Sequence, residues 1–321
     1  MFLEVLLLLV GFAILIKGAD FLVNGSSSIA KKFNISNLAI GLTVVAFGTS
    51  TPELIVSLLS AVDGKSDASF GNAIGSNNFN LLFILGVAGL IYPLVVQRNT
   101  VKYEVPLSLL AALVLYVLVN DQIVSGSQDI LSRVDALILI GFFGLFMLYI
   151  FRTMKNSSDL DQGEIKIYTT PVAVGLTMLG LALLVGGGKL VVDNAVSIAQ
   201  HYGLSERLIG LTILAAGTSL PELATSAVAA YRKNTDIAIG NVIGSNIFNI
   251  FLILGITGLI KPIPYNASLN FDLEVLGAST VILMIFMFTI NQRKLDRWEA
   301  FLLLAGYIAY TIFLIANDSI G

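Results

Sequence analysis

The sequence predicts an all-α membrane protein of ten transmembrane helices, built as two inverted five-helix repeats. Three observations predict this fold class: the chain is strongly apolar, its apolar residues fall into ten long runs, and the first half recurs in the second. Hydrophobic residues make up 56% of the 321 residues and charged residues 12%, and the mean hydropathy is +0.88. Soluble domains carry about twice that share of charge, so the composition excludes a soluble fold.

Apolar runs of at least about 15–20 residues between polar breaks are candidates for transmembrane helices. Ten such runs lie near residues 2–24, 37–61, 71–92, 105–119, 134–151, 171–192, 208–230, 240–260, 273–290 and 298–316. Met1 leads into the first run without the pattern of a cleavage site, so we expect a transmembrane helix there rather than a removed signal peptide.

The second half of the chain repeats the first at a constant offset of 169 residues (222 − 53). The segment GLTVVAFGTSTPEL at residues 41–54 recurs as GLTILAAGTSLPEL at residues 210–223. A repeat of this length indicates two copies of one structural unit. We expect a first repeat at residues 1–151, a cytoplasmic linker at 152–169 and a second repeat at 170–321.

The Lys and Arg residues predict the orientation, because cytoplasmic loops carry an excess of them. One side of the membrane collects Lys31, Lys32, Arg98, Lys102, Arg152, Lys155, Lys166, Arg232, Lys233, Arg293, Lys294 and Arg297. The other side collects Lys65, Arg133, Arg207 and Lys261. The richer side is predicted to be cytoplasmic, which places both termini outside. Five spans per repeat is an odd number, so the second repeat is predicted to be inserted upside down.

Each copy of the repeated segment carries a proline followed by a glutamate in apolar surroundings. Pro52 and Pro221 lack an N–H group, so a helix should break at each and free the carbonyls of residues 46–48 and 215–217. Hydroxyl and carboxylate side chains surround the two breaks: Thr49, Ser50, Glu53, Thr218, Ser219 and Glu222. An ionisable group within a membrane segment indicates a functional site.

The two breaks offer carbonyl, hydroxyl and carboxylate oxygen, and the chain has no cysteine. Oxygen ligands in flexible geometry suit Ca²⁺, whereas transition metals favour nitrogen or sulfur. The other interpretation is a helix kink capped by its own side chains, with a protonated glutamate. We favour the ion site, because a kink requires neither the acid nor its repetition in both halves.

A second motif, GNAIGSNNFN at residues 71–80, recurs as GNVIGSNIFN at residues 240–249. Its polar residues are four apart, so each set forms one stripe on a helix. Asn72 and Asn241 are also open to interpretation as interhelical packing contacts. The deeper members of the stripes are predicted to supply further oxygens: Ser76, Asn80, Ser245 and Asn249.

These paired motifs, the inverted repeat and the short middle loop resemble the Ca²⁺/cation antiporter superfamily, specifically the prokaryotic members of its sodium/calcium exchanger branch. The resemblance covers nearly the whole chain. It implies that the second, third, seventh and eighth helices form a core around a midplane ion site, and that the first and sixth helices slide across it. It also implies an antiporter rather than an enzyme, with no cofactor, that exchanges three Na⁺ for one Ca²⁺ by alternating access and is therefore electrogenic.

The family's ion ligands, carried over position by position, match twelve residues of this chain: Ala46 (carbonyl), Thr49, Ser50, Glu53, Ser76, Asn80, Ala215 (carbonyl), Thr218, Ser219, Glu222, Ser245 and Asn249. In potassium-dependent relatives an Asp at the position of Asn80 or Asn249 is associated with K⁺. Asparagine at both positions implies exchange that is independent of K⁺.

Three alternative functions remain to be separated. A proton/calcium antiporter of the same fold is the nearest, since a carboxylate can carry H⁺ in place of Na⁺. A channel fits two inverted half-sites poorly, and a membrane-embedded hydrolase lacks an H-E-x-x-H or G-x-S-x-G motif. The expected partners are membrane lipid, Ca²⁺ and Na⁺, with neither nucleic acid nor an obligate protein partner.

The predicted topology can be tested by cysteine labelling, because the chain has no native cysteine. Single cysteines at Lys65 and Arg133 should react with an impermeant reagent from outside, and those at Lys155 and Arg232 only from inside. Labelling of positions 65 and 232 from the same side would contradict the inverted repeat.

Overall fold

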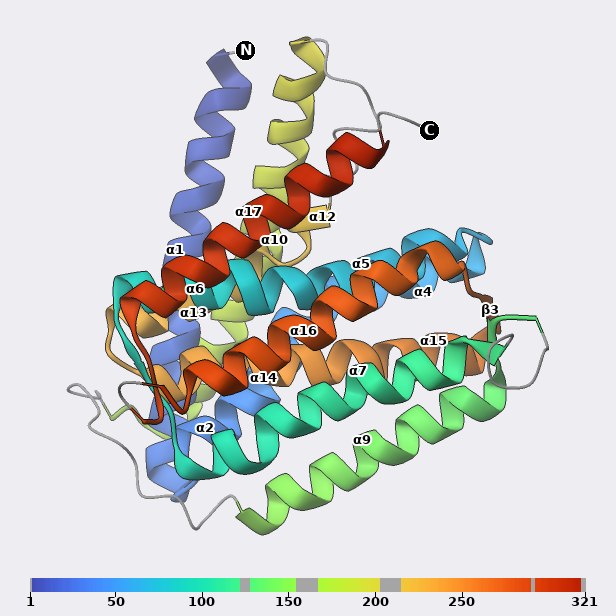
Figure 1. The fold of residues 1–321 in the computed structure, drawn as a ribbon. Coiled ribbons are helices and arrows are strands. Elements are labelled where there is room, and N and C mark those ends of the chain that lie inside the picture. Colours follow the sequence, from blue (N-terminus) through green and yellow to red (C-terminus); the bar gives the residue numbers. More distant parts are fainter. Residues whose placement is uncertain (1, 122–127, 154–166, 203–214, 290–291, 319–321) are drawn as a thin grey trace.

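The computed structural model describes residues 2–121, 128–153, 167–202, 215–289 and 292–318, and these residues are almost entirely helical (Figure 1). Among them, eight helices are long and apolar enough to cross a membrane. A ninth candidate is the bent pair formed by 37–49 and 51–62, whose axes differ by 46°. The start of the predicted span at 208–230 and most of the 152–169 linker lie outside the described residues.

The first half of the chain supplies five of these candidate spans. Their helical segments are α1 (Phe2–Phe33), α2 (Asn37–Ile40), η1 (Gly41–Val45), α3 (Ala46–Thr49), α4 (Thr51–Val62), α5 (Ser66–Asn78), η2 (Phe79–Ile84), α6 (Leu85–Ile91), η3 (Thr100–Glu104), α7 (Val105–Val119) and α9 (Arg133–Thr153). The segments η1, η2 and η3 are π-helical. The span expected at 105–119 matches α7, and η3 extends it to Thr100.

The second half is helical in the same order. Its segments are α10 (Thr170–His201), α12 (Ala215–Gly217), α13 (Leu220–Tyr231), α14 (Thr235–Ile247), η5 (Phe248–Leu254), α15 (Gly255–Ile260), η6 (Ala267–Leu269), α16 (Asn270–Phe286) and α17 (Arg297–Asp318). The π-helix η5 follows α14 as η2 follows α5. This correspondence supports the prediction of two copies of one unit.

Helices α1 and α10 extend beyond the apolar runs at 2–24 and 171–192 that predicted them. The extra turns contain polar residues that bond back to their own helix. The Ser26 hydroxyl donates to the Leu22 carbonyl at 2.6 Å, and the Asn194 amide donates to the Leu190 carbonyl at 2.7 Å. Such bonds satisfy the side chains without ending the helix.

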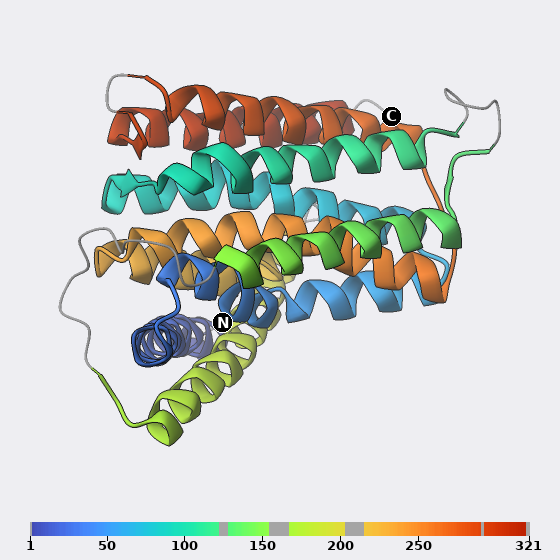
Figure 2. The ribbon, with the colours of Figure 1, turned by 90° about the horizontal axis from the view of Figure 1, so that it is seen from below.

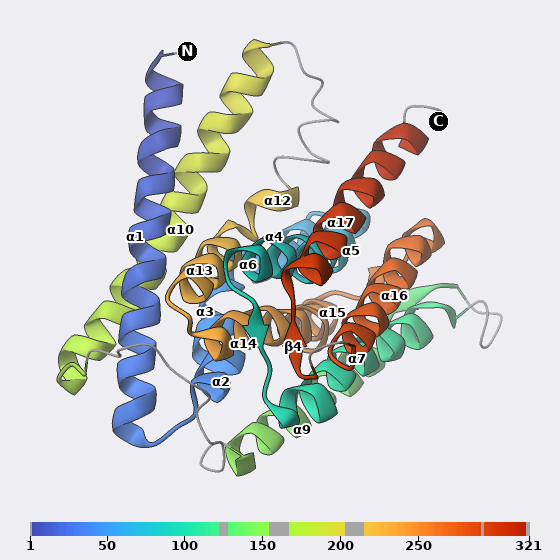
Figure 3. The ribbon, with the colours of Figure 1, turned by 60° about the vertical axis from the view of Figure 1, so that its left-hand side comes forward.

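Glycines let α1 and α10 approach closely. A Cβ atom placed on Gly18 would lie 3.0 Å from the Gly180 carbonyl oxygen, and one on Gly180 would lie 2.6 Å from the Leu22 nitrogen. Figures 1 and 3 show the two helices side by side, projecting away from the others. Small residues at such a crossing permit backbone contact between membrane helices.

The remaining helices run roughly parallel to one another, with α16 and α17 farthest from α1 (Figure 2). Many large apolar side chains on the outer helices are exposed, among them Leu145 on α9, Ile285 on α16 and Phe301 on α17. Exposed apolar surface on this scale is unusual for a soluble protein. It is the surface that a membrane-embedded bundle presents to lipid.

Two short antiparallel strand pairs join the halves of the chain. Strand β1 (Leu94–Val95) pairs with β4 (Lys294–Leu295), and β2 (Ile130–Leu131) pairs with β3 (Ile263–Pro264). Each pair takes one strand from the first half and one from the second. The strands therefore tie together loops that lie far apart in the sequence.

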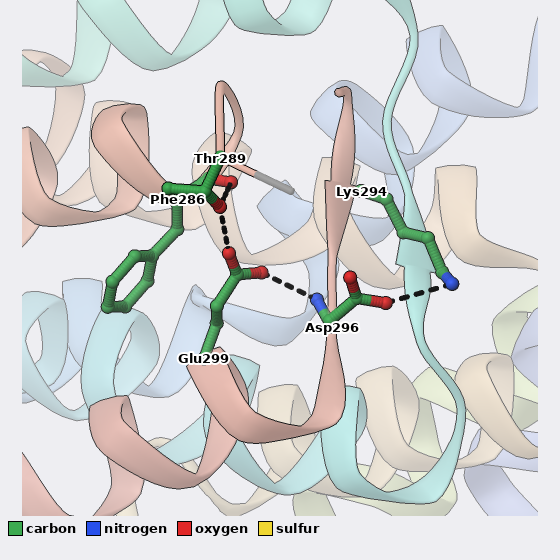
Figure 4. A network of polar contacts seen from close by, with 5 residues as sticks. All are labelled: Phe286, Thr289, Lys294, Asp296 and Glu299. Atoms are coloured by element: carbon green, nitrogen blue, oxygen red, sulfur yellow. Dashed lines mark hydrogen bonds and ion pairs between the residues drawn. The ribbon is translucent and has the colours of Figure 1, made fainter. Parts of the chain in front are cut away.

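A polar network closes the turn between α16 and α17 (Figure 4). Glu299, in the first turn of α17, accepts hydrogen bonds from the Thr289 hydroxyl and, at 2.7 Å, from the Asp296 backbone N–H. Lys294 forms an ion pair with Asp296 at 2.8 Å. A carboxylate at this position satisfies a free N–H group and favours the positive end of the helix dipole.

The α1–α10 contact predicts the effect of a large side chain at the crossing. Gly18→Leu should lower the melting temperature of the purified protein in detergent, because the obstructing atoms of Gly180 and Leu184 are backbone and cannot rotate away. Overpacking of this kind costs about 1–3 kcal/mol. Gly175→Leu on α10 is the matched control, since nothing lies within 4 Å of its Cβ position. Equal melting temperatures for the two variants would contradict the close contact.

Candidate functional site

In both repeated segments the helix breaks at the serine two residues before the proline. Ser50 (φ −82°, ψ 8°) lies between α3 and α4, and Ser219 (φ −90°, ψ 8°) lies directly before α13. Pro52 and Pro221 then occupy the first turns of α4 and α13, where a missing N–H group costs nothing. The predicted breaks are therefore confirmed in both halves, with the same backbone geometry.

The expectation that the break frees the Ala46 carbonyl is wrong. This oxygen accepts the Ser50 N–H at 2.9 Å and lies 3.3 Å from the Thr49 hydroxyl. Helical bonding continues up to the break, because the proline removes the donor of a later residue. Its repeat counterpart, Ala215, is the first residue of α12.

Two buried carboxylates each accept a hydrogen bond from a serine in the other half of the chain. Glu53 Oε1 accepts from the Ser219 hydroxyl at 2.9 Å, and Glu222 Oε1 accepts from the Ser50 hydroxyl at 2.8 Å. Glu53 is 1% exposed and Glu222 is fully buried. Each serine at a break therefore contacts the glutamate of the other half.

The serines of the second motif join the same cluster. Ser76 Oγ lies 3.0 Å from Ser219 Oγ, and the Ser245 hydroxyl lies 3.4 Å from Glu222 Oε1. Both serines are buried. The structure thus brings α5 and α14 against the two broken helices, in agreement with the core that the family resemblance implies.

Asn72 and Asn241 hold the threonines at the breaks. The Thr49 hydroxyl donates to Asn241 Oδ1 at 3.1 Å, and the Thr218 hydroxyl donates to Asn72 Oδ1 at 3.2 Å. Each asparagine also donates through Nδ2 to the backbone carbonyl of the glutamate in its own half, at 3.1 and 3.3 Å. These contacts favour the interpretation of both asparagines as interhelical packing residues.

A further asparagine pair, Asn77 and Asn246, was missed by the sequence interpretation. Asn80 donates to Asn246 Oδ1 at 3.0 Å, and Asn249 donates to Asn77 Oδ1 at 2.9 Å. Asn77 and Asn246 also donate to each other's backbone carbonyls, at 3.1 and 3.3 Å. Their recurrence 169 residues apart was the signal that could have identified them.

Four side-chain oxygens of the two motifs are buried and have no hydrogen-bond partner among the described residues. They are Oε2 of Glu53, Oε2 of Glu222, Oδ1 of Asn80 and Oδ1 of Asn249. Buried polar atoms in proteins are nearly always satisfied, so these four, two from each half, require an explanation. All four can accept and none can donate when the glutamates are ionised, which is the property of cation ligands.

The comparison with known families decides the identity of the chain. The model of a family described as "Sodium/calcium exchanger protein" matches residues 3–152 and 172–316. The chain belongs to this family. The resemblance drawn from the two sequence motifs is therefore confirmed.

Relatives of this exchanger-family chain match most of its length. It is 33% identical to the sodium/calcium exchanger MaX1 of Methanosarcina acetivorans over 350 residues, which cover 96% of this chain and 97% of MaX1. It is 39% identical to the inner membrane protein YrbG of Escherichia coli K12, with 82% and 81% covered. The fold matches the sodium-calcium exchanger NCX_Mj with a TM-score of 0.81 and 35% identity, covering 98% of this chain and 99% of NCX_Mj. The chain is thus a multi-pass membrane protein of a family of cation/Ca²⁺ antiporters.

The asparagine pair generates a stability prediction. Asn77→Ala and Asn246→Ala should each lower the free energy of unfolding, because each leaves buried amide groups of its neighbours without partners, at about 1–3 kcal/mol per group. Chemical denaturation in detergent measures the change. Asn266→Ala is the control, since that exposed side chain bonds only at the surface, to Asp67 and to the Ser268 N–H. A loss no larger than that of the control would show that the asparagine pair does not stabilise the core.

Proposed function

We propose that this chain is a sodium/calcium antiporter that binds Na⁺ and Ca²⁺ at one site. We call this site the central cluster: Glu53, Glu222 and the polar residues of the two motifs around them. The observation that carries the proposal is the set of four buried, unpartnered oxygens on Glu53, Glu222, Asn80 and Asn249. The other polar atom of each side chain already forms a hydrogen bond within the protein. The free oxygens therefore offer lone pairs to a ligand, and two carboxylates among them favour a cation over a neutral hydrogen-bond donor.

The proposed ligands are the free oxygens together with the hydroxyls at the breaks and on α5 and α14. Backbone carbonyls at the two alanines complete the set, since a carbonyl oxygen in a helical hydrogen bond keeps a second lone pair. The full set is Ala46, Thr49, Ser50, Glu53, Ser76, Asn80, Ala215, Thr218, Ser219, Glu222, Ser245 and Asn249.

Charge balance supports exchange at one shared site. Glu53 and Glu222 together neutralise one Ca²⁺ or two Na⁺, and both ions prefer oxygen ligands. Binding of one Ca²⁺ and two Na⁺ at once would leave two positive charges uncompensated in a buried site, which is unfavourable at low dielectric. A third Na⁺ would add one positive charge to the loaded site, so exchange of three Na⁺ for one Ca²⁺ would be electrogenic.

Neutral side chains at Asn80 and Asn249 support exchange without K⁺. An acid at either position would add a third negative charge to the cluster and so favour a further cation. Both asparagines instead donate hydrogen bonds to Asn246 and Asn77, which a carboxylate could not do.

The proposed mechanism is alternating access between two inverted repeats, residues 1–151 and 170–321, with both termini outside. Each half contributes one glutamate and one asparagine to the free oxygens and one serine to the carboxylate of the other half. The site is therefore complete only between the two halves. A change in their packing would open it to one side of the membrane and then to the other.

Flux in proteoliposomes tests the proposal. With pH and membrane potential clamped, an outward Na⁺ gradient should drive ⁴⁵Ca²⁺ uptake that outward K⁺ or Li⁺ gradients support poorly. Glu53→Gln and Glu222→Gln should each reduce uptake to the background of empty vesicles, because one negative charge cannot balance Ca²⁺ in a buried site.

Asp272→Asn, which alters an acid outside the cluster, should retain uptake. Uptake driven by an imposed pH gradient with no Na⁺ present would replace this proposal with a proton/calcium antiporter. Wild-type exchange in either glutamine variant would refute the shared site.

A further inference from the structure

A further buried carboxylate lies outside the central cluster and has no cationic partner among the described residues. Glu104, the last residue of η3, is 2% exposed. Its Oε1 accepts a hydrogen bond from the Tyr149 hydroxyl of α9, and its Oε2 is buried without a partner. Within the described residues, no Lys, Arg or His forms an ion pair with it. An isolated buried carboxylate is strongly destabilising unless its charge is balanced.

Glu104 lines a small pocket between α2, η3 and α9. Polar side chains from three separate segments face this space: Ser36 before α2, Asn99 before η3 and Thr153 at the end of α9. The pocket has a volume of about 10 Å³, which is room for one water-sized ligand. The walls thus combine a carboxylate with hydroxyl and amide groups, the same donor classes as in the central cluster.

The hydrogen bonds of the hydroxyl groups leave oxygen lone pairs available. The Thr153 hydroxyl donates its proton to the Tyr149 carbonyl at 2.9 Å, so its oxygen can only accept further interactions. A cation can use these lone pairs, and unlike a water molecule it also balances the charge of the buried carboxylate.

The pocket lies apart from the central cluster. Leu42 lines it and Thr49 lies seven residues further along the same helix, which is about 10 Å at 1.5 Å per residue. One carboxylate balances one monovalent ion, whereas Ca²⁺ would leave a positive charge uncompensated in this buried setting. The space for a single water-sized ligand favours the smaller Na⁺ over K⁺.

We propose that Glu104, with Ser36, Asn99 and Thr153, binds one Na⁺ at a site separate from the exchange cluster. This ion neutralises the buried carboxylate and links the start of the second membrane helix to the fourth and fifth. Bound Na⁺ thereby stabilises the position of the helix that leads to Thr49 and Ser50. It does not depend on which ions the central cluster transports.

Thermal unfolding of the purified full-length protein in detergent tests the proposal. The background is the double variant Glu53→Gln, Glu222→Gln, which removes both carboxylates of the central cluster. In this background NaCl should raise the melting temperature in a saturable manner, whereas KCl and choline chloride at equal ionic strength should not. A ligand that binds only the folded state stabilises it in this way.

Adding Glu104→Gln to the double variant should abolish the Na⁺-dependent rise. Adding Asp272→Asn should leave it unchanged, since Asp272 also accepts a tyrosine hydroxyl, from Tyr310, but does not line the pocket. Should Glu104→Gln fail to fold, Thr153→Val provides the second test. It removes one oxygen ligand and should shift the Na⁺ midpoint upward by about tenfold.

Three results would overturn the second site: no Na⁺-specific stabilisation in the double variant, its persistence after Glu104→Gln, or an unchanged midpoint in Thr153→Val. If low pH raised the melting temperature and Na⁺ had no effect, Glu104 would bind a proton instead of Na⁺. Wild-type flux is measured independently, so failure of this proposal leaves the sodium/calcium exchange proposal standing.

Discussion

The burial of two like charges in an apolar bundle is the constraint on which the rest of the structure depends. Glu53 and Glu222 lie in a low-dielectric interior, where an unbalanced charge is far less stable than in water. The chain supports them with neutral groups: a serine hydroxyl from the opposite half and the N-terminal end of a helix for each. These groups lower the cost of burial without cancelling the charge. The ions of the proposed exchange would complete the balance.

Interrupted helices follow from this constraint. An unbroken helix through residue 50 would have no helix N-terminus near Glu53 and no turn at which the Ser50 hydroxyl crosses to the other half. Pro52 makes the interruption stable, because it prefers the first turn of α4 to any interior position. The asparagines Asn72 and Asn241 then hold the threonines beside the interruptions.

Much of this site could be predicted from the sequence, because its determinants are local. Proline followed by glutamate sets the break, and a four-residue spacing sets the polar stripe of Ser76 and Asn80. The Ala46 carbonyl was misjudged, since its fate depends on where helical bonding stops. The Asn77–Asn246 pair and the Glu104 pocket were missed because both arise from contacts between distant helices. Local spacing carries no information on which helix faces which.

The strand pairs have a consequence for how the protein is made. Leu94 pairs with Leu295, so the backbone groups of β1 remain without their partner until about 200 further residues have been synthesised (295 − 94 = 201). Strand β2 likewise waits for Ile263 and Pro264. A newly inserted first half therefore carries open strand edges, which are prone to pair wrongly. Synthesis of β4, which lies between α16 and α17, supplies the partner of the first of these edges, so this edge closes later than that of β2.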